Sequence, residues 1–134
     1  SDKERVAMRD YGRHIGIAFQ LIDDVMDYKS TAEEMGKNVG DDLAEGKPTL
    51  PLIQAMKVAS EPDKKLIRKA IREGGLEDLE PIMNIVSRSG AITYTEEMAQ
   101  QQADLAIKAL EPLSDTSFKQ TLIKLANIAA NRSA

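Results

Sequence analysis

Three aspartates lie within five positions of an apolar segment near the start of the chain. Residues 19–30 read FQLIDDVMDYKS, which places Asp23, Asp24 and Asp27 among large aliphatic side chains. Positions i and i+4 share one face of an α-helix, so Asp23 and Asp27 would lie one above the other with Asp24 at the edge. Like charges at this spacing repel each other, and a bound cation would relieve the repulsion. Ligands that are all carboxylates select hard ions such as Mg²⁺, Ca²⁺ or Mn²⁺.

Gln20 belongs to the same predicted helix face, because it precedes Asp23 by three positions and Asp24 by four. Mg²⁺ keeps several waters and commonly bridges one or two carboxylates to a substrate phosphate, so the pattern also indicates a phosphorylated ligand. The alternative is a solvated acidic helix face, since a DDxxD pattern occurs by chance in roughly 3% of chains of this length. Aspartate is, however, a poor residue within a helix, and three in an apolar segment need some compensation.

The segment that follows, KSTAEEMGKNVGDDLAEGK, contains two lysines that each come directly after a glycine, Lys37 and Lys47. A lysine ammonium group suits phosphate oxygens, and glycine lets the backbone approach a ligand closely. This pattern favours a diphosphate held between a metal ion and the lysines; the alternative is a charged surface loop. We interpret the near-copy DDLAE at 41–45 as loop structure with Asp42 as a candidate cap of a short turn, and a second metal site there is the less favoured alternative.

The elements that must position these residues are predicted to be helices. Apolar residues at Ile15, Phe19, Ile22 and Met26 predict a first helix from about Lys3 to Tyr28. Further helices are expected over 49–59, 61–73, 76–89, from Thr93 to about Leu110, and over 116–132. The expected helix starts are Ser60 with Asp63, Thr93 with Glu96, and Asp115; the expected helix ends are Gly74-Gly75 and Gly90.

Composition agrees with an all-α protein, because good helix formers dominate and only 4% of the residues are aromatic. The 134 residues suffice for one domain with a real core. A net charge of -4 and a pI near 5.1 argue against nucleic acid as a partner. No apolar run approaches the length of a membrane span. The absence of cysteine excludes disulfides and thiolate zinc sites and agrees with a cytoplasmic location.

The run GIAFQLIDDVMDYKSTAEEMGKNVGDDLAEGKPTLPLI resembles the second aspartate-rich region of trans-polyprenyl diphosphate synthases. The resemblance rests on FQxxDDxxD, a Gly-Lys ten residues beyond the last aspartate, and GDDLxEGKxTLP. It continues through GAITYTEEMAQQQADLAIKAL and LIKLANIAANR. The sequence is more similar to the long-chain members of this family, the octaprenyl-forming ones above all, than to its farnesyl synthases.

The resemblance implies an all-α bundle of the isoprenoid-synthase type around a deep cleft. Such enzymes condense an allylic prenyl diphosphate with isopentenyl diphosphate, here to a long-chain precursor of quinone side chains. Mg²⁺ bound by two aspartate-rich motifs neutralises the diphosphate as it leaves, and the isopentenyl double bond attacks the allylic cation. The implied metal ligands are Asp23 first, then Asp24 and Asp27 directly or through water; the implied contacts to the allylic diphosphate are Gln20, Lys37 and, less strongly, Lys47.

The sequence also departs from the family pattern. The first aspartate motif with its arginine pair, the Gly-Lys-x-x-Arg-Pro isopentenyl site and the Lys-Thr motif are absent from these residues. We therefore interpret 1–134 as a C-terminal fragment that is inactive alone and belongs to a homodimer when full-length. It comprises a helix with the second motif (1–29), a lysine- and glycine-containing loop (30–47) and a helical remainder (48–134). The alternative is a helical interaction module or a noncatalytic partner subunit of a synthase, which would not need the aspartates, Gln20 or Lys37.

Overall fold

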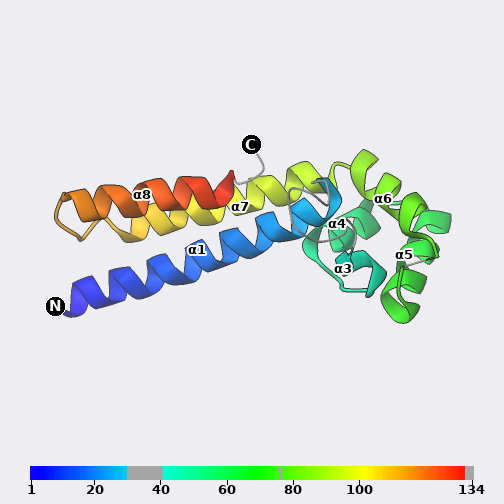
Figure 1. Ribbon diagram of the computed structural model, residues 1–134, viewed down its shortest axis with the longest axis horizontal. Coiled ribbons are helices and arrows are strands. Elements are labelled where there is room, and N and C mark those ends of the chain that lie inside the picture. The colour runs from blue at the N-terminus through cyan, green and yellow to red at the C-terminus, as the bar shows by residue number, and fades with distance from the viewer. Residues whose placement is uncertain (30–40, 76, 132–134) are drawn as a thin grey trace. The chain divides into compact units, whose positions relative to one another are not determined.

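The computed structural model of the chain describes residues 1–29, 41–75 and 77–131, and these residues contain helices and no strand. The all-α prediction is therefore confirmed for the described part of the chain. The helices are α1 (Asp2–Lys29), α3 (Asp41–Ala44), α4 (Leu50–Val58), α5 (Glu61–Glu73), α6 (Leu79–Arg88), α7 (Ala91–Ala109) and α8 (Ser117–Ala130) (Figure 1). The chain divides into two compact units, one of Ser1–Ile22 with Glu96–Ala134 and one of Asp23–Thr95.

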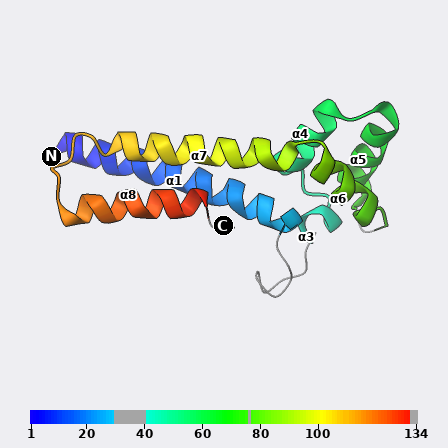
Figure 2. The same ribbon diagram turned by 90° about the horizontal axis from the view of Figure 1, so that it is seen from above.

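The first unit consists of the N-terminal part of α1 packed with α7 and α8 (Figure 2). Small side chains allow these helices to approach closely; the buried cluster is Tyr11, Ala103, Ala106, Leu110, Leu122, Ala126 and Ala130. Two polar contacts fix the packing. The Tyr11 hydroxyl donates to the Leu122 carbonyl at 2.7 Å, and His14 Nδ1 lies 2.8 Å from Gln102 Oε1. The single histidine is therefore in contact with an amide side chain within the first unit.

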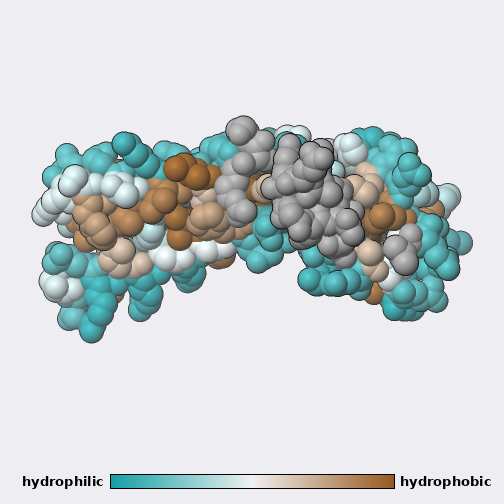
Figure 3. Space-filling model, viewed as in Figure 1, coloured by the Kyte–Doolittle hydropathy of each residue, from teal (hydrophilic) through white to brown (hydrophobic). Residues whose placement is uncertain are grey.

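The last helix, α8, has two apolar faces. Leu122, Ala126 and Ala129 are buried, whereas Phe118, Leu125 and Ile128 are exposed. Figure 3 shows apolar side chains at the surface of this part of the molecule. The exposed residues follow steps of seven and three, so they form one stripe along the helix. A stripe of this kind is typical of an interaction surface.

The second unit contains α3, α4, α5 and α6 together with the end of α1 and the start of α7. Each of these helices turns an apolar face toward one core; the buried cluster is Leu43, Leu52, Ala55, Ile67, Ala70, Ile82, Ile85, Val86 and Ala91. Tyr28 of α1 packs against this cluster. The aspartate segment of α1 is thus anchored in the same unit as the segment that carries Lys47.

The short helix α3 lies within the segment that was expected to be a loop. Leu43, which is fully buried, anchors it in the core. Its C-terminal end forms a Schellman motif, in which Gly46 N–H donates to the Leu43 carbonyl (2.9 Å) and Lys47 N–H donates to the Asp42 carbonyl (3.0 Å). Gly46 has the positive φ of 76° that this motif requires. The main chain is therefore fixed from Asp42 to Lys47.

Glycines also allow α3 to lie against the end of α5. The N–H of Gly75 bonds with the carbonyls of Leu43 (3.1 Å) and Ala44 (3.2 Å). A Cβ atom would lie 2.6 Å from the Ala70 carbonyl oxygen if placed on Gly46, and 2.6 Å from the Leu43 carbonyl oxygen if placed on Gly75. Both separations are too short for any other residue, so the position of α3 depends on these glycines.

Several expected helix boundaries are confirmed. Helix α5 spans Glu61–Glu73 as predicted, and Ser60 Oγ accepts a hydrogen bond from Asp63 N–H at 3.4 Å. Gly74 ends this helix with a φ of 91°.

The expected start of α6 differs from the structure. Helix α6 begins at Leu79, three residues later than the start expected at residue 76.

Two predicted N-caps are wrong. Helix α7 begins at Ala91, so Thr93 lies inside it, and Ser89 Oγ accepts from the Ala91 N–H at 3.2 Å instead. The first residue before α8 is Thr116, whose hydroxyl accepts from Lys119 N–H at 3.2 Å. Asp115, the expected cap, accepts a hydrogen bond from the Gln120 side chain. In both cases a competing hydroxyl one to four residues away satisfies the helix N–H groups.

We expect Gly46→Ala to lower the free energy of unfolding by about 2 kcal/mol or more, because a side chain at positive φ is strained and the added Cβ meets the Ala70 carbonyl. Gly12→Ala is the matched control. Gly12 lies in α1, is exposed, and a Cβ there meets nothing within 4 Å, so this change should raise stability by about 0.5–1 kcal/mol. Urea denaturation of the two variants measures both effects. Equal effects at the two glycines would contradict the fixed geometry of α3.

Candidate metal and diphosphate site

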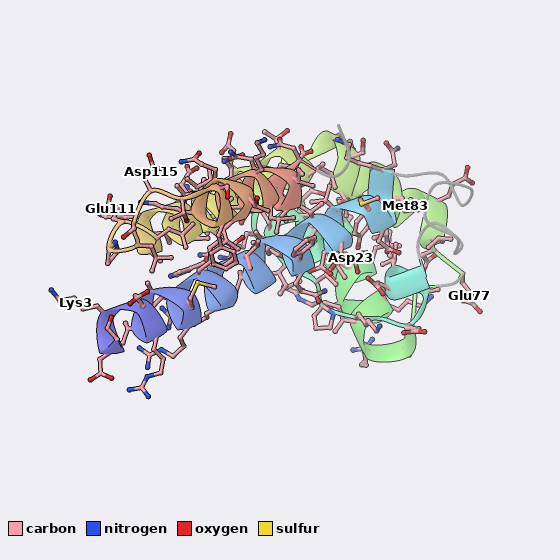
Figure 4. All side chains as sticks on the ribbon, turned by 60° about the vertical axis from the view of Figure 1, so that its left-hand side comes forward. Lys3, Asp23, Glu77, Met83, Glu111 and Asp115 are labelled. Carbon is pink, nitrogen blue, oxygen red and sulfur yellow. The ribbon has the colours of Figure 1, made fainter. Side chains whose placement is uncertain are left out.

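The three predicted metal ligands lie on the last turns of α1, in the second unit. Figure 4 labels Asp23 on this part of the helix. Asp27 is 0% exposed, Asp24 is buried, and Asp23 is partly buried. Burying carboxylic groups costs free energy, so a protein keeps them inside only where they have partners or a use. This burial speaks against the alternative of a solvated acidic helix face.

Asp27 joins α1 to α3. Its Oδ1 accepts a hydrogen bond from the backbone N–H of Asp42 at 3.3 Å. Asp42 lies in the first turn of α3, where N–H groups have no partner within the helix, and a carboxylate is a favourable acceptor for them. The structure therefore brings the aspartate helix into direct contact with the DDLAE segment, which the sequence analysis interpreted as a loop with a short turn.

Lys47 is held at the other end of α3. Its Nζ lies 3.3 Å from Glu45 Oε2 and 3.4 Å from Asp42 Oδ1. Hydrogen bonds that the Lys47 ammonium donates to Glu45 and then to Asp42 raise the pKa of Lys47, so the ammonium form is favoured. The side chain of Lys47 remains 56% exposed. Lys47 can thus present a positive charge to a ligand while its backbone is fixed.

The structure gives less information on the other two predicted site residues, Gln20 and Lys37. Gln20 is exposed on α1, in the part that belongs to the first unit. Lys37 lies outside the described residues. Over 1–29, 41–75 and 77–131, no group of three or more histidine, aspartate or glutamate side chains is arranged to hold a metal ion. Asp23, Asp24 and Asp27 therefore share a helix segment without forming a closed cage.

Tyr28 is a further polar residue at this site, and sequence reasoning missed it. The hydroxyls of Tyr28 and Thr49 are both buried without a hydrogen-bond partner among the described residues. Burial is the main cause that raises the pKa of Tyr28; the Thr49 hydroxyl acts in the opposite direction, and the carboxylates of Asp27, Asp42 and Asp24 add to the increase. The only signal in the sequence is that Tyr28 directly follows Asp27.

The sequence is similar to known prenyl-diphosphate synthases. Residues 1–87 match the family model described as polyprenyl synthetase. The octaprenyl diphosphate synthase of Escherichia coli (strain K12) is 47% identical over 131 residues, which are 97% of this chain and 41% of that protein. The all-trans-nonaprenyl-diphosphate synthase (geranyl-diphosphate specific) of Rhodobacter capsulatus is 44% identical over 128 residues, covering 96% of this chain and 39% of that protein. The chain spans about 40% of the length of these relatives.

Solved structures show the same likeness. A polyprenyl synthase from Caulobacter crescentus CB15, complexed with calcium and isoprenyl diphosphate, matches with a TM-score of 0.92 and 37% identity, over 100% of this chain and 42% of that one. A geranylgeranyl pyrophosphate synthase from Corynebacterium glutamicum, complexed with isoprenyl diphosphate and magnesium, matches with a TM-score of 0.87 and 29% identity, over 98% of this chain and 38% of that one.

Among the described helices, none has the length and apolar character needed to cross a membrane.

Two tyrosine-to-phenylalanine changes should differ in their effect on stability at neutral pH. Tyr11→Phe removes a buried hydrogen bond to the Leu122 carbonyl and should cost about 1–2 kcal/mol of unfolding free energy. Tyr28→Phe removes a buried hydroxyl without a partner among the described residues and should be neutral or slightly stabilising. Thermal melts of the two variants measure this difference. A loss of stability in Tyr28→Phe as large as that in Tyr11→Phe would show that the Tyr28 hydroxyl is bonded.

The same variants should differ at high pH. The pKa of Tyr28 in the folded chain is raised, whereas an unfolded tyrosine has a pKa of about 10. Above about pH 10 the unfolded chain therefore loses this proton while the folded chain keeps it, so stability falls as pH rises. Tyr28→Phe should make the fall between pH 9.5 and about 11 shallower. Burial also raises the pKa of Tyr11, which accounts for a remaining slope.

Proposed function

We infer that this chain, which belongs to the polyprenyl synthetase family, supplies the second metal- and diphosphate-binding part of a prenyltransferase. The enzyme would condense an allylic prenyl diphosphate with isopentenyl diphosphate to a long-chain, octaprenyl-like trans-polyprenyl diphosphate. The observation that carries this proposal is the burial of Asp24 and Asp27 at the end of α1, joined through Asp42 to the ammonium group of Lys47. The longer enzyme is proposed to be a cytoplasmic homodimer.

The donor set of the site fits Mg²⁺. Asp23, Asp24 and Asp27 offer only oxygen ligands, which hard cations prefer. Mg²⁺ requires one or two protein carboxylates, because waters and substrate phosphates complete its octahedron. One or two of these carboxylates are therefore sufficient for it, whereas Ca²⁺ takes more protein oxygens. When bound, the cation would supply charge neutralisation for the diphosphate leaving group.

The positive and polar side chains would bind the diphosphate from the other side. Lys47 carries a favoured ammonium form and a partly exposed tip. Lys37 and Gln20 remain the other predicted contacts. As the allylic C–O bond ionises, negative charge collects on the diphosphate oxygens, and donors already fixed in place stabilise that charge without reorganising.

An interaction module is the second candidate function. The exposed stripe of Phe118, Leu125 and Ile128 on α8 favours it, because exposed apolar patches mark protein contacts. Such a module would have no use for the ionic site on α1 and α3. The two functions can therefore be separated by substitutions in the aspartates.

The chain on its own should not form polyprenyl diphosphates. It spans about 40% of its relatives, and the motifs that hold isopentenyl diphosphate are not in its sequence. We expect no product from the purified 134-residue chain with Mg²⁺, an allylic diphosphate and radiolabelled isopentenyl diphosphate. The E. coli octaprenyl diphosphate synthase serves as the positive control. Measurable chain elongation by this chain alone would contradict the assignment of its role.

A chimera tests the proposal directly. The chain replaces the matching 131 residues of the E. coli octaprenyl diphosphate synthase, with which it is 47% identical. The chimera should elongate prenyl diphosphates, and Asp23→Ala in it should lower kcat by roughly 10²–10³, because the lost interaction acts mainly in the transition state. The melting temperature should hold, since the change relieves charge repulsion and introduces a better helix former.

Asp10→Ala is the matched control in the same chimera, because Asp10 lies on the same helix and forms an ion pair with its neighbour Arg9 at 3.5 Å. It should change kcat by less than about twofold. A chimera that folds but has no activity would overturn the enzymatic proposal. Near-normal kcat in Asp23→Ala would instead show that the aspartates are structural.

A further inference from the structure

Asp42 makes two polar contacts that lead to different functional groups. Its backbone N–H donates to Asp27 Oδ1 at 3.3 Å, and its own Oδ1 accepts from Lys47 Nζ at 3.4 Å. We propose that Asp42 is a positioning residue, which holds the ammonium group of Lys47 ready for the allylic diphosphate at a fixed place relative to the carboxylates of α1. This inference rests on the function proposed above, and it assigns a role to Asp42 within the DDLAE segment.

The backbone around Asp42 is rigid enough for this role. The Schellman motif ties Lys47 N–H to the Asp42 carbonyl, so the two residues of the ion pair are also joined through the main chain. Leu43, between them, is fully buried, and Gly75 bonds to its carbonyl. Asp42 therefore cannot move without displacing α3 from the core. The Lys47 side chain, which is 56% exposed, is less constrained than the backbone around it.

An ion pair can restrict that side chain. A lysine loses up to about 2 kcal/mol of rotamer entropy when it is immobilised. If Asp42 already limits the rotamers of Lys47, less of this cost falls on substrate binding, which is the general benefit of preorganisation. The carboxylate of Asp42 is only 14% exposed, so water screens the pair less than it would at an open surface.

Glu45 provides a matched comparison. Its Oε2 lies 3.3 Å from Lys47 Nζ, which is no farther than Asp42. Its side chain, however, is 64% exposed, and exposed ion pairs contribute little. The backbone N–H of Asp42, in contrast, is bonded to Asp27 of α1. Two carboxylates at nearly the same distance from one ammonium group thus differ in burial and in their connection to the aspartate helix.

The test uses the active chimera with Asp42→Asn and Glu45→Gln, each made alone and together with Lys47→Ala. Asparagine keeps the backbone N–H that bonds to Asp27, so Asp42→Asn removes mainly the charge facing Lys47. We expect it to raise the KM for the allylic diphosphate about fivefold to tenfold and to change kcat by less than about twofold, with an unchanged melting temperature. In the Lys47→Ala background it should have no further effect, and Glu45→Gln should change KM less than about twofold.

Three kinetic results would overturn the inference: an unchanged KM, a lower KM, or an equal increase in KM with and without Lys47. The last result would mean that Asp42 acts on the ligand or the metal directly. A chimera without activity would instead count against the proposed function, so a second measurement is made on the 134-residue chain. Side-chain NMR relaxation of Lys47 should show greater mobility in Asp42→Asn and not in Glu45→Gln. Equal mobility of Lys47 in the native chain and in Asp42→Asn would refute the positioning role.

Discussion

The burial of Asp27 is the constraint on which the second unit depends. A fully buried carboxylic group costs several kcal/mol unless its oxygens are bonded. One of these oxygens accepts a hydrogen bond from the N–H of Asp42, which lies fifteen residues later in the sequence. This N–H must point at α1 and must not be used within its own segment. A helix start supplies such an N–H, because the first N–H groups of a helix have no partner within it. The start of the short helix α3 must therefore lie next to Asp27.

Helix α3 is too short to hold its position by itself. Four residues form barely one turn, so its stability must come from tertiary contacts. Leu43 enters the core, the C-terminal carbonyls bond to Gly75, and Gly46 passes under the Ala70 carbonyl at a distance that excludes a Cβ atom. The same contacts fix the backbone of Lys47. The hydrogen bond that the buried Asp27 carboxylate needs therefore also determines where the ammonium group of Lys47 lies.

The sequence predicts the features that are local. The predicted bounds of α5 agree with the structure because the signals that set them are local. Ser60 and Gly74 directly flank the thirteen residues of the helix, and the apolar spacing lies within it. The aspartate pattern on α1 was likewise visible, as was the family resemblance that the comparisons confirm. Thr93 and Asp115 were wrong as caps because a nearby hydroxyl competes for the same N–H groups, and local patterns do not rank such competitors. The roles of Asp42 and Tyr28 were missed because they arise from the contact between α3 and α1 and from packing against the core of the second unit, which no local pattern contains.

The distribution of unsatisfied polar groups gives evidence about function that is independent of any motif. Tyr11, the buried tyrosine of the first unit, has a bonded hydroxyl, as is usual for a structural residue. In the second unit, the buried hydroxyls of Tyr28 and Thr49 lack partners among the described residues, and the nearby carboxylates raise the pKa of Tyr28 further. A stable core would exclude such groups, since apolar residues of the same shape would cost less. Violations of this kind are expected where a protein keeps polar groups for binding or chemistry. They occur next to Asp27, at the segment that the aspartate pattern identified.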